Sequence, residues 1–259
     1  MLNSHDVLWL NVSPSLKHLD RPLLHYLSRS ANVARWEYLQ TRDEASSLEK
    51  AVVLLHDYLK CQSRPVHLVG HGMGGVLGLI YARRYPRRVQ SLTLLAVAVQ
   101  PAATWHAHYY VQRQLLPCSR QQVLANTVRS LFGDQPPYPV KHLVTALGRD
   151  LEEAPCLHSL FQLVSLPKGG VDMPLMICGS KNDPVVDASA LSEWMNWLKP
   201  EDLLWDCPEG RHFFHYFYPE QVGAQILEFW RQFDRPFHSL NAPISMKKSP
   251  AQGDLIWDT

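Results

Sequence analysis

Short apolar runs alternate along this chain with segments of helical periodicity, and this alternation restricts the possible folds more than any other feature. The apolar runs predict strands at residues 7–12, 33–39, 66–69, 91–99, 175–178 and 203–206. The intervening patterns predict helices at residues 20–27, 41–59, 74–85, 188–198 and 219–233. Strands that alternate with helices favour a parallel sheet, because each crossover helix returns over one face of the sheet. The sequence therefore predicts an α/β fold.

Residues 100–171 interrupt the alternation. They contain helical patterns and many prolines but no convincing strand pattern, so we interpret them as an inserted helical cap. The predicted core then consists of residues 1–99 and 172–233. Residues 234–259 contain three prolines and have weak periodicity, which is typical of a terminal tail. A chain of 259 residues suits one large domain with such an insertion.

Two helix starts carry local sequence signals. Asp20 is a candidate N-cap, and Pro22 follows it in the first turn, where proline is tolerated. Thr41 and Glu44 have the spacing of a capping box and precede an apolar stripe on one helical face. Both signals predict that a helix begins at these positions.

Charge and hydrophobicity exclude several classes of protein. The 25 basic and 24 acidic residues give a net charge of +1, which provides no field to hold a nucleic acid. A hydrophobic fraction of 46% is too high for a disordered chain. The most apolar stretch, residues 91–99, is far shorter than the roughly 20 residues that cross a bilayer. We therefore expect neither a nucleic-acid partner nor a membrane span.

Cysteine usage and the N-terminus indicate a cytoplasmic protein. The five cysteines are an odd number and form no C-x-x-C pair, so we expect reduced thiols and no disulfide framework. The first residues lack the basic segment of a signal peptide. We expect no metal site and no cofactor, and a small molecule as ligand or substrate. The oligomeric state is left open.

Five of the 13 glycines fall within nine positions, directly after the strand predicted at residues 66–69. Gly70, Gly72 and Gly75 match the dinucleotide-binding pattern G-x-G-x-x-G. That pattern requires an acidic residue about 20 positions further on, which binds the ribose. No Asp or Glu occurs between Gly75 and Asp134. The dinucleotide interpretation is therefore disfavoured.

The same glycines also match the nucleophile elbow G-x-S-x-G, with Gly72 at the serine position. The stretch HLVGHGMGGVLGLIYARRYPRRVQSLTLL resembles the strand, elbow, helix and next strand of the α/β-hydrolase fold superfamily. ICGSKNDPVV and PEGRHFFHYFYPEQV resemble the acid and histidine segments of that family, in its chain order. The resemblance covers about residues 6–233. It implies a sheet of the α/β-hydrolase type, with Asp183 and His212 at the acid and histidine positions.

The sequence departs from the family pattern in three respects. Gly72 has no side-chain atom with which to form an acyl-enzyme. The family often has a His-Gly pair after its first parallel strand, where this chain has Leu10-Asn11-Val12-Ser13-Pro14. The antiparallel strands that usually precede that strand are expected to be missing. These departures argue against ordinary ester hydrolysis.

Three functions follow from this pattern. The first is binding of a small, partly apolar ligand under the cap, without serine chemistry; its candidate residues are Asn11, Ser13, His71, Met73, Trp105 and Tyr109. The second is a hydrolase or lyase in which the Asp183–His212 pair activates water or substrate. The alternative to this chemistry is that Asp183 and His212 only hydrogen-bond each other. The third function is a scaffold whose surface, cap or tail binds another protein.

Two serines and four histidines are further site candidates. Ser13 and Ser180 are expected on loops near the elbow, where either is a possible substitute nucleophile, although loop serines commonly cap or turn the chain. His106 and His108 are two apart, which suits a metal pair on a strand, but no third ligand is near them in the sequence. We interpret both as surface or pocket residues. His71 and His215 are interpreted as hydrogen-bonded neighbours of the two motifs.

Overall fold

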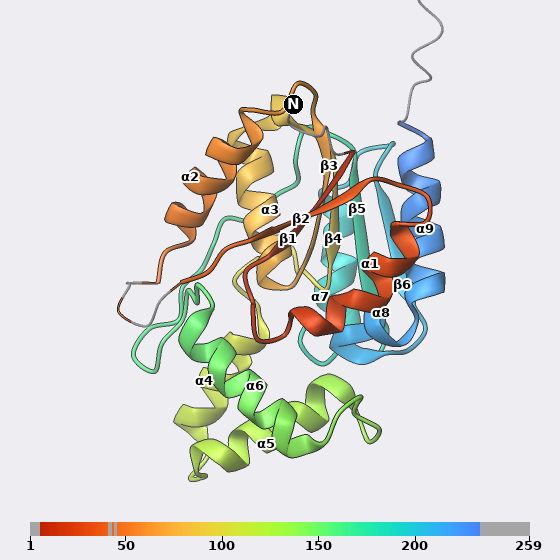
Figure 1. Cartoon of the computed structure of the whole chain (residues 1–259). Helices are drawn as coiled ribbons and strands as arrows, with labels where there is room; N and C mark the ends of the chain where they lie inside the picture. The colour runs from red at the N-terminus through yellow and green to blue at the C-terminus, as the bar shows by residue number, and fades with distance from the viewer. Residues whose placement is uncertain (1–5, 41–42, 44–45, 234–259) are drawn as a thin grey trace, which may run out of the picture.

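A six-stranded parallel sheet forms the centre of the computed structural model, which describes residues 6–40, 43 and 46–233 (Figure 1). The strand order is β2-β1-β3-β4-β5-β6, and each neighbouring pair is parallel. The strands are β1 (Val7–Asn11), β2 (Val33–Glu37), β3 (Val66–His71), β4 (Val89–Leu95), β5 (Leu175–Ser180) and β6 (Leu203–Cys207). This sheet confirms the predicted α/β fold.

Helices cover both faces of the sheet, and each face has its own apolar core. Because successive strand residues point to opposite faces, Leu8 and Leu10 of β1 join one core while Val7 and Trp9 join the other. The first core includes α2 (Leu48–Leu59), α3 (Met73–Arg84) and α7 (Ala188–Ser192). The second includes α1 (Arg21–Leu27), α8 (Phe214–Phe217) and α9 (Pro219–Arg231).

Three helices lie between β4 and β5 in the sequence and gather beyond the carboxyl ends of the strands (Figure 1). They are α4 (Trp105–Leu115), α5 (Arg120–Phe132) and α6 (Val140–Glu153). In the described part of the chain, residues 96–174 contain no strand, in agreement with the helical character expected there. The limits of a cap at residues 100 and 171 stay a prediction.

The strand order places the carboxyl ends of β1 and β3 at a reversal of the chain path. From β1 the chain passes to β2 on one side and then to β3 on the other side of β1. In open α/β sheets, ligands bind in the crevice at such a reversal. The loop after β1 and the turn after β3 therefore frame the candidate site.

The predicted start of α1 is confirmed, because Asp20 is its N-cap residue and Pro22 lies in the first turn. The Asp20 side chain makes no capping hydrogen bond, because its carboxylate accepts from Trp9, Asn11 and His215 instead. Other predicted element limits were wrong. The helix expected from Thr41 begins at Leu48 as α2, and its N-cap is Ser47, which accepts a bond from the Lys50 amide. Thr41 and Glu44 lie outside the described residues.

The remaining differences are at strand and helix ends. Strand β4 stops at Leu95, because Ala96 has φ +53° and turns the chain away from the sheet. The helix expected at residues 188–198 divides into α7 and a short 3-10 helix, η3 (Glu193–Asn196). The tail predicted at residues 234–259 lies outside the described residues. Among the helices that are described, none has the length and apolar character needed to cross a bilayer.

Candidate functional site

Gly72 forms a sharp turn between β3 and α3. Its φ of +50° and ψ of −122° are strained for an L residue with a side chain. The Gly72 amide donates to the Leu95 carbonyl at 2.9 Å, and its carbonyl accepts from the Val76 amide at 2.9 Å. A Cβ on Gly74 would lie 2.3 Å from the Leu10 carbonyl oxygen, so glycine at this position lets α3 lie close to β1.

Asp183 and His212 meet beside this turn. Asp183 follows β5, and His212 lies in the 3-10 helix η4 (Arg211–Phe213); both side chains are buried. Asp183 Oδ2 lies 3.0 Å from His212 Nδ1, and Asp183 Oδ1 accepts from the Val185 amide at 2.8 Å. Because an ionised carboxylate only accepts, Nδ1 carries the proton of a neutral His212 ring and Nε2 keeps a lone pair.

The lone pair of His212 faces the position that a side chain on residue 72 would occupy. A Cβ built on Gly72 would lie 3.9 Å from His212 Nε2, and no described atom outside its chain neighbours is nearer. A hydroxyl on such a Cβ would come within about 2.6–3.2 Å of Nε2, the separation of a nucleophile and its base. The structure thus brings together Gly72, Asp183 and His212, which are far apart in the sequence.

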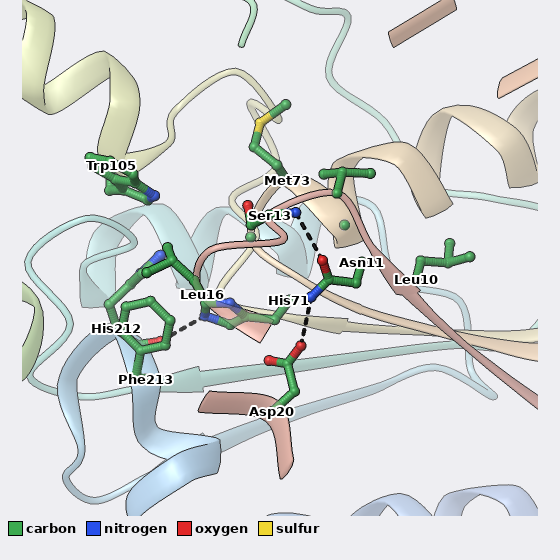
Figure 2. Close-up of a pocket in the computed structure, with 13 residues that line it drawn as sticks. Leu10, Asn11, Ser13, Leu16, Asp20, His71, Met73, Trp105, His212 and Phe213 are labelled. Atoms are coloured by element: carbon green, nitrogen blue, oxygen red, sulfur yellow. Dashed lines mark hydrogen bonds between the residues drawn. The ribbon is translucent and has the colours of Figure 1, made fainter. Parts of the chain in front are cut away.

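A small cavity of about 30 Å³ lies at this junction (Figure 2). It has room for ordered water but not for a ligand of several hundred Å³. Its lining comes from the loop after β1, the elbow, η4 and the start of α4. The lining residues are Leu10, Asn11, Val12, Ser13, Leu16, Asp20, His71, Gly72, Met73, Gly74, Trp105, His212 and Phe213.

A second polar network lies beside the cavity. Asp20, in the 3-10 helix η1 (Lys17–Asp20), accepts at Oδ2 from Trp9 Nε1 and from Asn11 Nδ2, both at 3.0 Å. Its Oδ1 lies 3.1 Å from His215 Nε2. His71 Nε2 donates to the His212 carbonyl at 2.9 Å, and the His71 and His215 rings are 4.4 Å apart between centroids. Figure 2 shows Asn11 linking the Ser13 loop to Asp20.

Comparisons with known proteins agree with this fold. Residues 60–153 match the family model described as alpha/beta hydrolase fold. The uncharacterized protein alr2406 of Nostoc sp. is 60% identical over 231 residues, which are 89% of this chain and 92% of that protein. The chain has the α/β-hydrolase fold.

Two solved structures show how far the likeness in fold extends. Naproxen esterase from Bacillus subtilis aligns with a TM-score of 0.67 and 13% identity, over 89% of this chain and 85% of that one. A membrane phospholipase A described as a bacterial virulence factor aligns with a TM-score of 0.69 and 17% identity, over 91% and 81% of the two chains. At these identities the likeness concerns the fold alone.

Five of the six expected ligand residues line the cavity of this α/β-hydrolase fold: Asn11, Ser13, His71, Met73 and Trp105. Tyr109 does not line it. Tyr109 is buried one helical turn further along α4, where it packs in the apolar core. A role of Tyr109 in ligand binding stays a prediction.

The structure also tests the alternative nucleophiles and the paired histidines. Ser180 is buried at the end of β5, not on a loop, and donates to Asn182 at 2.9 Å. Ser13 Oγ donates to Asp150 at 3.3 Å.

His106 was expected at the surface or in a pocket, but it is buried on helix α4 and pairs with Asp150 at 3.1 Å, outside the cavity lining. His108 lies on the same helix, not on a strand.

Sequence reasoning missed Asp20 as a member of the site and did not link it to His215. The spacing of His212 and His215 carries a weak signal, because residues three apart on a helical turn lie on one side. No local signal joins Asp20 to His215, which is 195 residues away.

The pKa of His71 is held well below its ordinary 6.5 by burial, and by the neighbouring His215 and His212. The His71 ring is therefore neutral near pH 7.

Proposed function

We propose that this protein is a cytoplasmic ligand-binding member of the α/β-hydrolase superfamily with a degenerate triad, which lacks the serine mechanism. The observation that carries this proposal is the position of Gly72. Its absent side chain would point to His212 Nε2, with the Cβ 3.9 Å away. No side-chain atom of residue 72 is present to attack an acyl carbon. The ligand is expected at the place where a hydrolase would hold its reacting group.

The surroundings of Gly72 suit a small ligand with one polar end. Helix α3 begins at Met73, and its first backbone N–H groups form a site for a carboxylate or phosphate oxygen. Leu16, Trp105 and Phe213 contribute apolar surface on the other side of the cavity. Because the cavity holds only about 30 Å³, a ligand larger than water requires lining side chains to move.

A second candidate function is hydrolysis or lyase chemistry by activated water. It is favoured by the 3.0 Å contact between Asp183 and His212 Nδ1, which leaves the lone pair on Nε2. This nitrogen is 3.9 Å from the position that a Cβ on residue 72 would occupy. A water held there would be a nucleophile with His212 as its general base. Such an enzyme would form no covalent intermediate on residue 72.

Three measurements on the purified protein separate these functions. Native mass spectrometry tests for a co-purified small molecule. Hydrolysis of short-chain aryl esters by wild type and His212→Ala tests for base catalysis. Labelling by a fluorophosphonate, which reacts with activated serines, is compared among wild type, Gly72→Ser and the double variant Gly72→Ser/His212→Ala. Gly72→Ala is the matched control, because it adds the same backbone strain without a hydroxyl.

We expect wild type to show no labelling and no ester turnover above the level of His212→Ala. We expect Gly72→Ser alone to be labelled, because its hydroxyl lies within reach of His212. Turnover by unlabelled wild type that disappears in His212→Ala would contradict the ligand-binding proposal and support activated water. Labelling of wild type would overturn both, because it would place a nucleophilic serine elsewhere in the chain.

A further inference from the structure

Two histidines and one aspartate gather under the elbow, outside the Asp183–His212 pair. Asp20 comes from η1, His71 from the end of β3, and His215 from α8. One ligand atom from each of the three lies within 4.8 Å of those of the other two, and no other such group of His, Cys, Asp or Glu occurs in the residues that the structure describes. His215 is fully buried and Asp20 is nearly so.

The hydrogen bonds around this cluster determine which nitrogen atoms carry lone pairs. The Asp20 carboxylate and the His212 carbonyl oxygen only accept, so His215 Nε2 and His71 Nε2 are the donors. A neutral imidazole has one N–H, so Nδ1 of each ring is left with a lone pair. His215 Nδ1 is buried and has no hydrogen-bond partner among the described residues. This nitrogen is on the side of the ring away from Asp20, so an ion bound to Asp20 would meet His215 at Nε2 and replace the proton there; Nε2 and Asp20 Oδ1, 3.1 Å apart, have the separation of two ligands of one ion.

The donor set is one that divalent transition metals prefer. Two imidazole lone pairs and one carboxylate are the protein ligands of many open zinc and iron(II) sites. The partner of His71 also fits, because metal-bound histidines usually donate their other N–H to a carbonyl or carboxylate. His71 Nε2 donates to the His212 carbonyl, which leaves the His71 Nδ1 lone pair for the ion. Asp20 is held at Oδ2 by Trp9 and Asn11, which orients the carboxylate.

We propose that Asp20, His71 and His215 bind one divalent transition-metal ion, with an open coordination position toward the cavity beside Gly72. Asp20, His71 and Gly72 all line that cavity, so a small molecule held there would reach the ion. The proposal differs from the expectation that the chain has no metal site. It does not depend on the proposed function, because metal binding and ligand binding are measured separately.

The His106–Asp150 pair provides a matched control. It is also a buried pair at 3.1 Å, and His106 Nδ1 is likewise buried without a partner among the described residues. It differs in belonging to no three-ligand cluster. Asp150→Asn and His106→Gln therefore reproduce the structural damage of Asp20→Asn and His215→Gln without touching the proposed site.

The test is zinc binding by chelator-treated full-length protein, measured by calorimetry and by elemental analysis after dialysis. We expect one Zn²⁺ per chain for wild type, Asp150→Asn and His106→Gln. We expect Asp20→Asn and His215→Gln to bind at least about 10–100-fold more weakly, the loss that even an outer-sphere change causes. Unchanged affinity in both of these variants would overturn the proposal, and so would the absence of zinc binding in wild type.

Substitution of wild type with Co²⁺ gives a second readout that needs no variant. We expect visible d–d absorption without a thiolate-to-metal charge-transfer band, because all proposed ligands are nitrogen and oxygen. A thiolate band would assign the ion to cysteines and overturn the proposal, even if the Asp20 and His215 variants fail to fold.

Discussion

Gly72 and Gly74 are two positions apart, yet different physical constraints require glycine at each. Gly72 has a positive φ, but the space beside it is open, with His212 Nε2 as the nearest atom at 3.9 Å. Gly74 has an ordinary helical backbone, but a Cβ there would meet the Leu10 carbonyl oxygen at 2.3 Å. One glycine relieves backbone strain, and the other permits close packing of α3 on β1.

These constraints predict an order of destabilisation for three alanine substitutions. Gly72→Ala should lower the free energy of unfolding by about 1–3 kcal/mol, the cost of a strained φ. Gly74→Ala should cost more than about 3 kcal/mol, because backbone must move. Gly78→Ala is the control and should stay within about 1 kcal/mol, since its Cβ meets only the ends of leucine side chains. Urea denaturation measures all three, and a Gly72→Ala protein as stable as wild type would contradict the elbow geometry.

A buried carboxylate of helix α6 bonds to the loop after β1. Asp150 accepts hydrogen bonds from Ser13 and Ser15 in the loop after β1, at 3.3 and 3.1 Å, and lies 3.1 Å from His106 of α4. The bonds link two of the inserted helices to the loop that lines the cavity. Asp150 therefore sets the position of this loop relative to α4.

Removal of this carboxylate should loosen the contact between the inserted helices and the sheet. We expect Asp150→Ala to lower the free energy of unfolding by about 3–5 kcal/mol, because it leaves buried His106 without its partner. Glu152→Ala, on the same helix, removes an exposed ion pair with Arg120 and should cost less than about 1 kcal/mol. Chemical denaturation compares the two, and equal costs would contradict the role assigned to Asp150.

Local signals predicted the existence of most elements but not all of their ends. The apolar stripe of α2 placed Leu48, Val52, Leu55 and Leu59 on one buried face, as the structure shows. The choice of Ser47 as its N-cap could not be read from spacing alone, because Thr41 and Glu44 offered a competing signal. Asp20 occupies the predicted N-cap position of α1, but its carboxylate bonds to Trp9, Asn11 and His215 and not to the helix backbone.

Burial of histidines couples the stability of the whole molecule to pH. The pKa of His158 is lowered by its burial, and that of His108 by its burial and by the nearby His212. Burial, together with nearby Arg21, also lowers the pKa of His18. A ring whose folded pKa lies below the ordinary 6.5 takes up protons on unfolding as the pH falls. The stabilising effect is therefore complete above pH 6.5 and declines below it.

We expect the urea midpoint of unfolding to fall between about pH 7.5 and pH 5.5, because the unfolded chain binds more protons in this range. His158→Gln should reduce the fall, since it removes one of the shifted rings while leaving a polar group near the Ala102 carbonyl. Measurement of both proteins at each pH checks the sign. A midpoint that rises on acidification would contradict it.

The sequence by itself determined the parts of this protein that depend on short-range patterns. Alternating apolar runs specify six strands and their crossover helices, because burial on both faces of a parallel sheet requires them. The glycine spacing specifies a tight turn from strand to helix at Gly72. The resemblance to the α/β-hydrolase family, carried by the chain order of Gly72, Asp183 and His212, implied that these three positions belong to one site.

Only the tertiary structure decided which distant groups share that site. Asp20 meets His215 across 195 residues, and Ser13 meets Asp150 across 137 residues. These contacts arise because the parallel strands end at one edge of the sheet in the order β2-β1-β3-β4-β5-β6. Local periodicity carries no information on strand order or on how η1 and α8 pack beside β1 and β3. The cluster of Asp20, His71 and His215 is therefore a property of the packing and not of any motif.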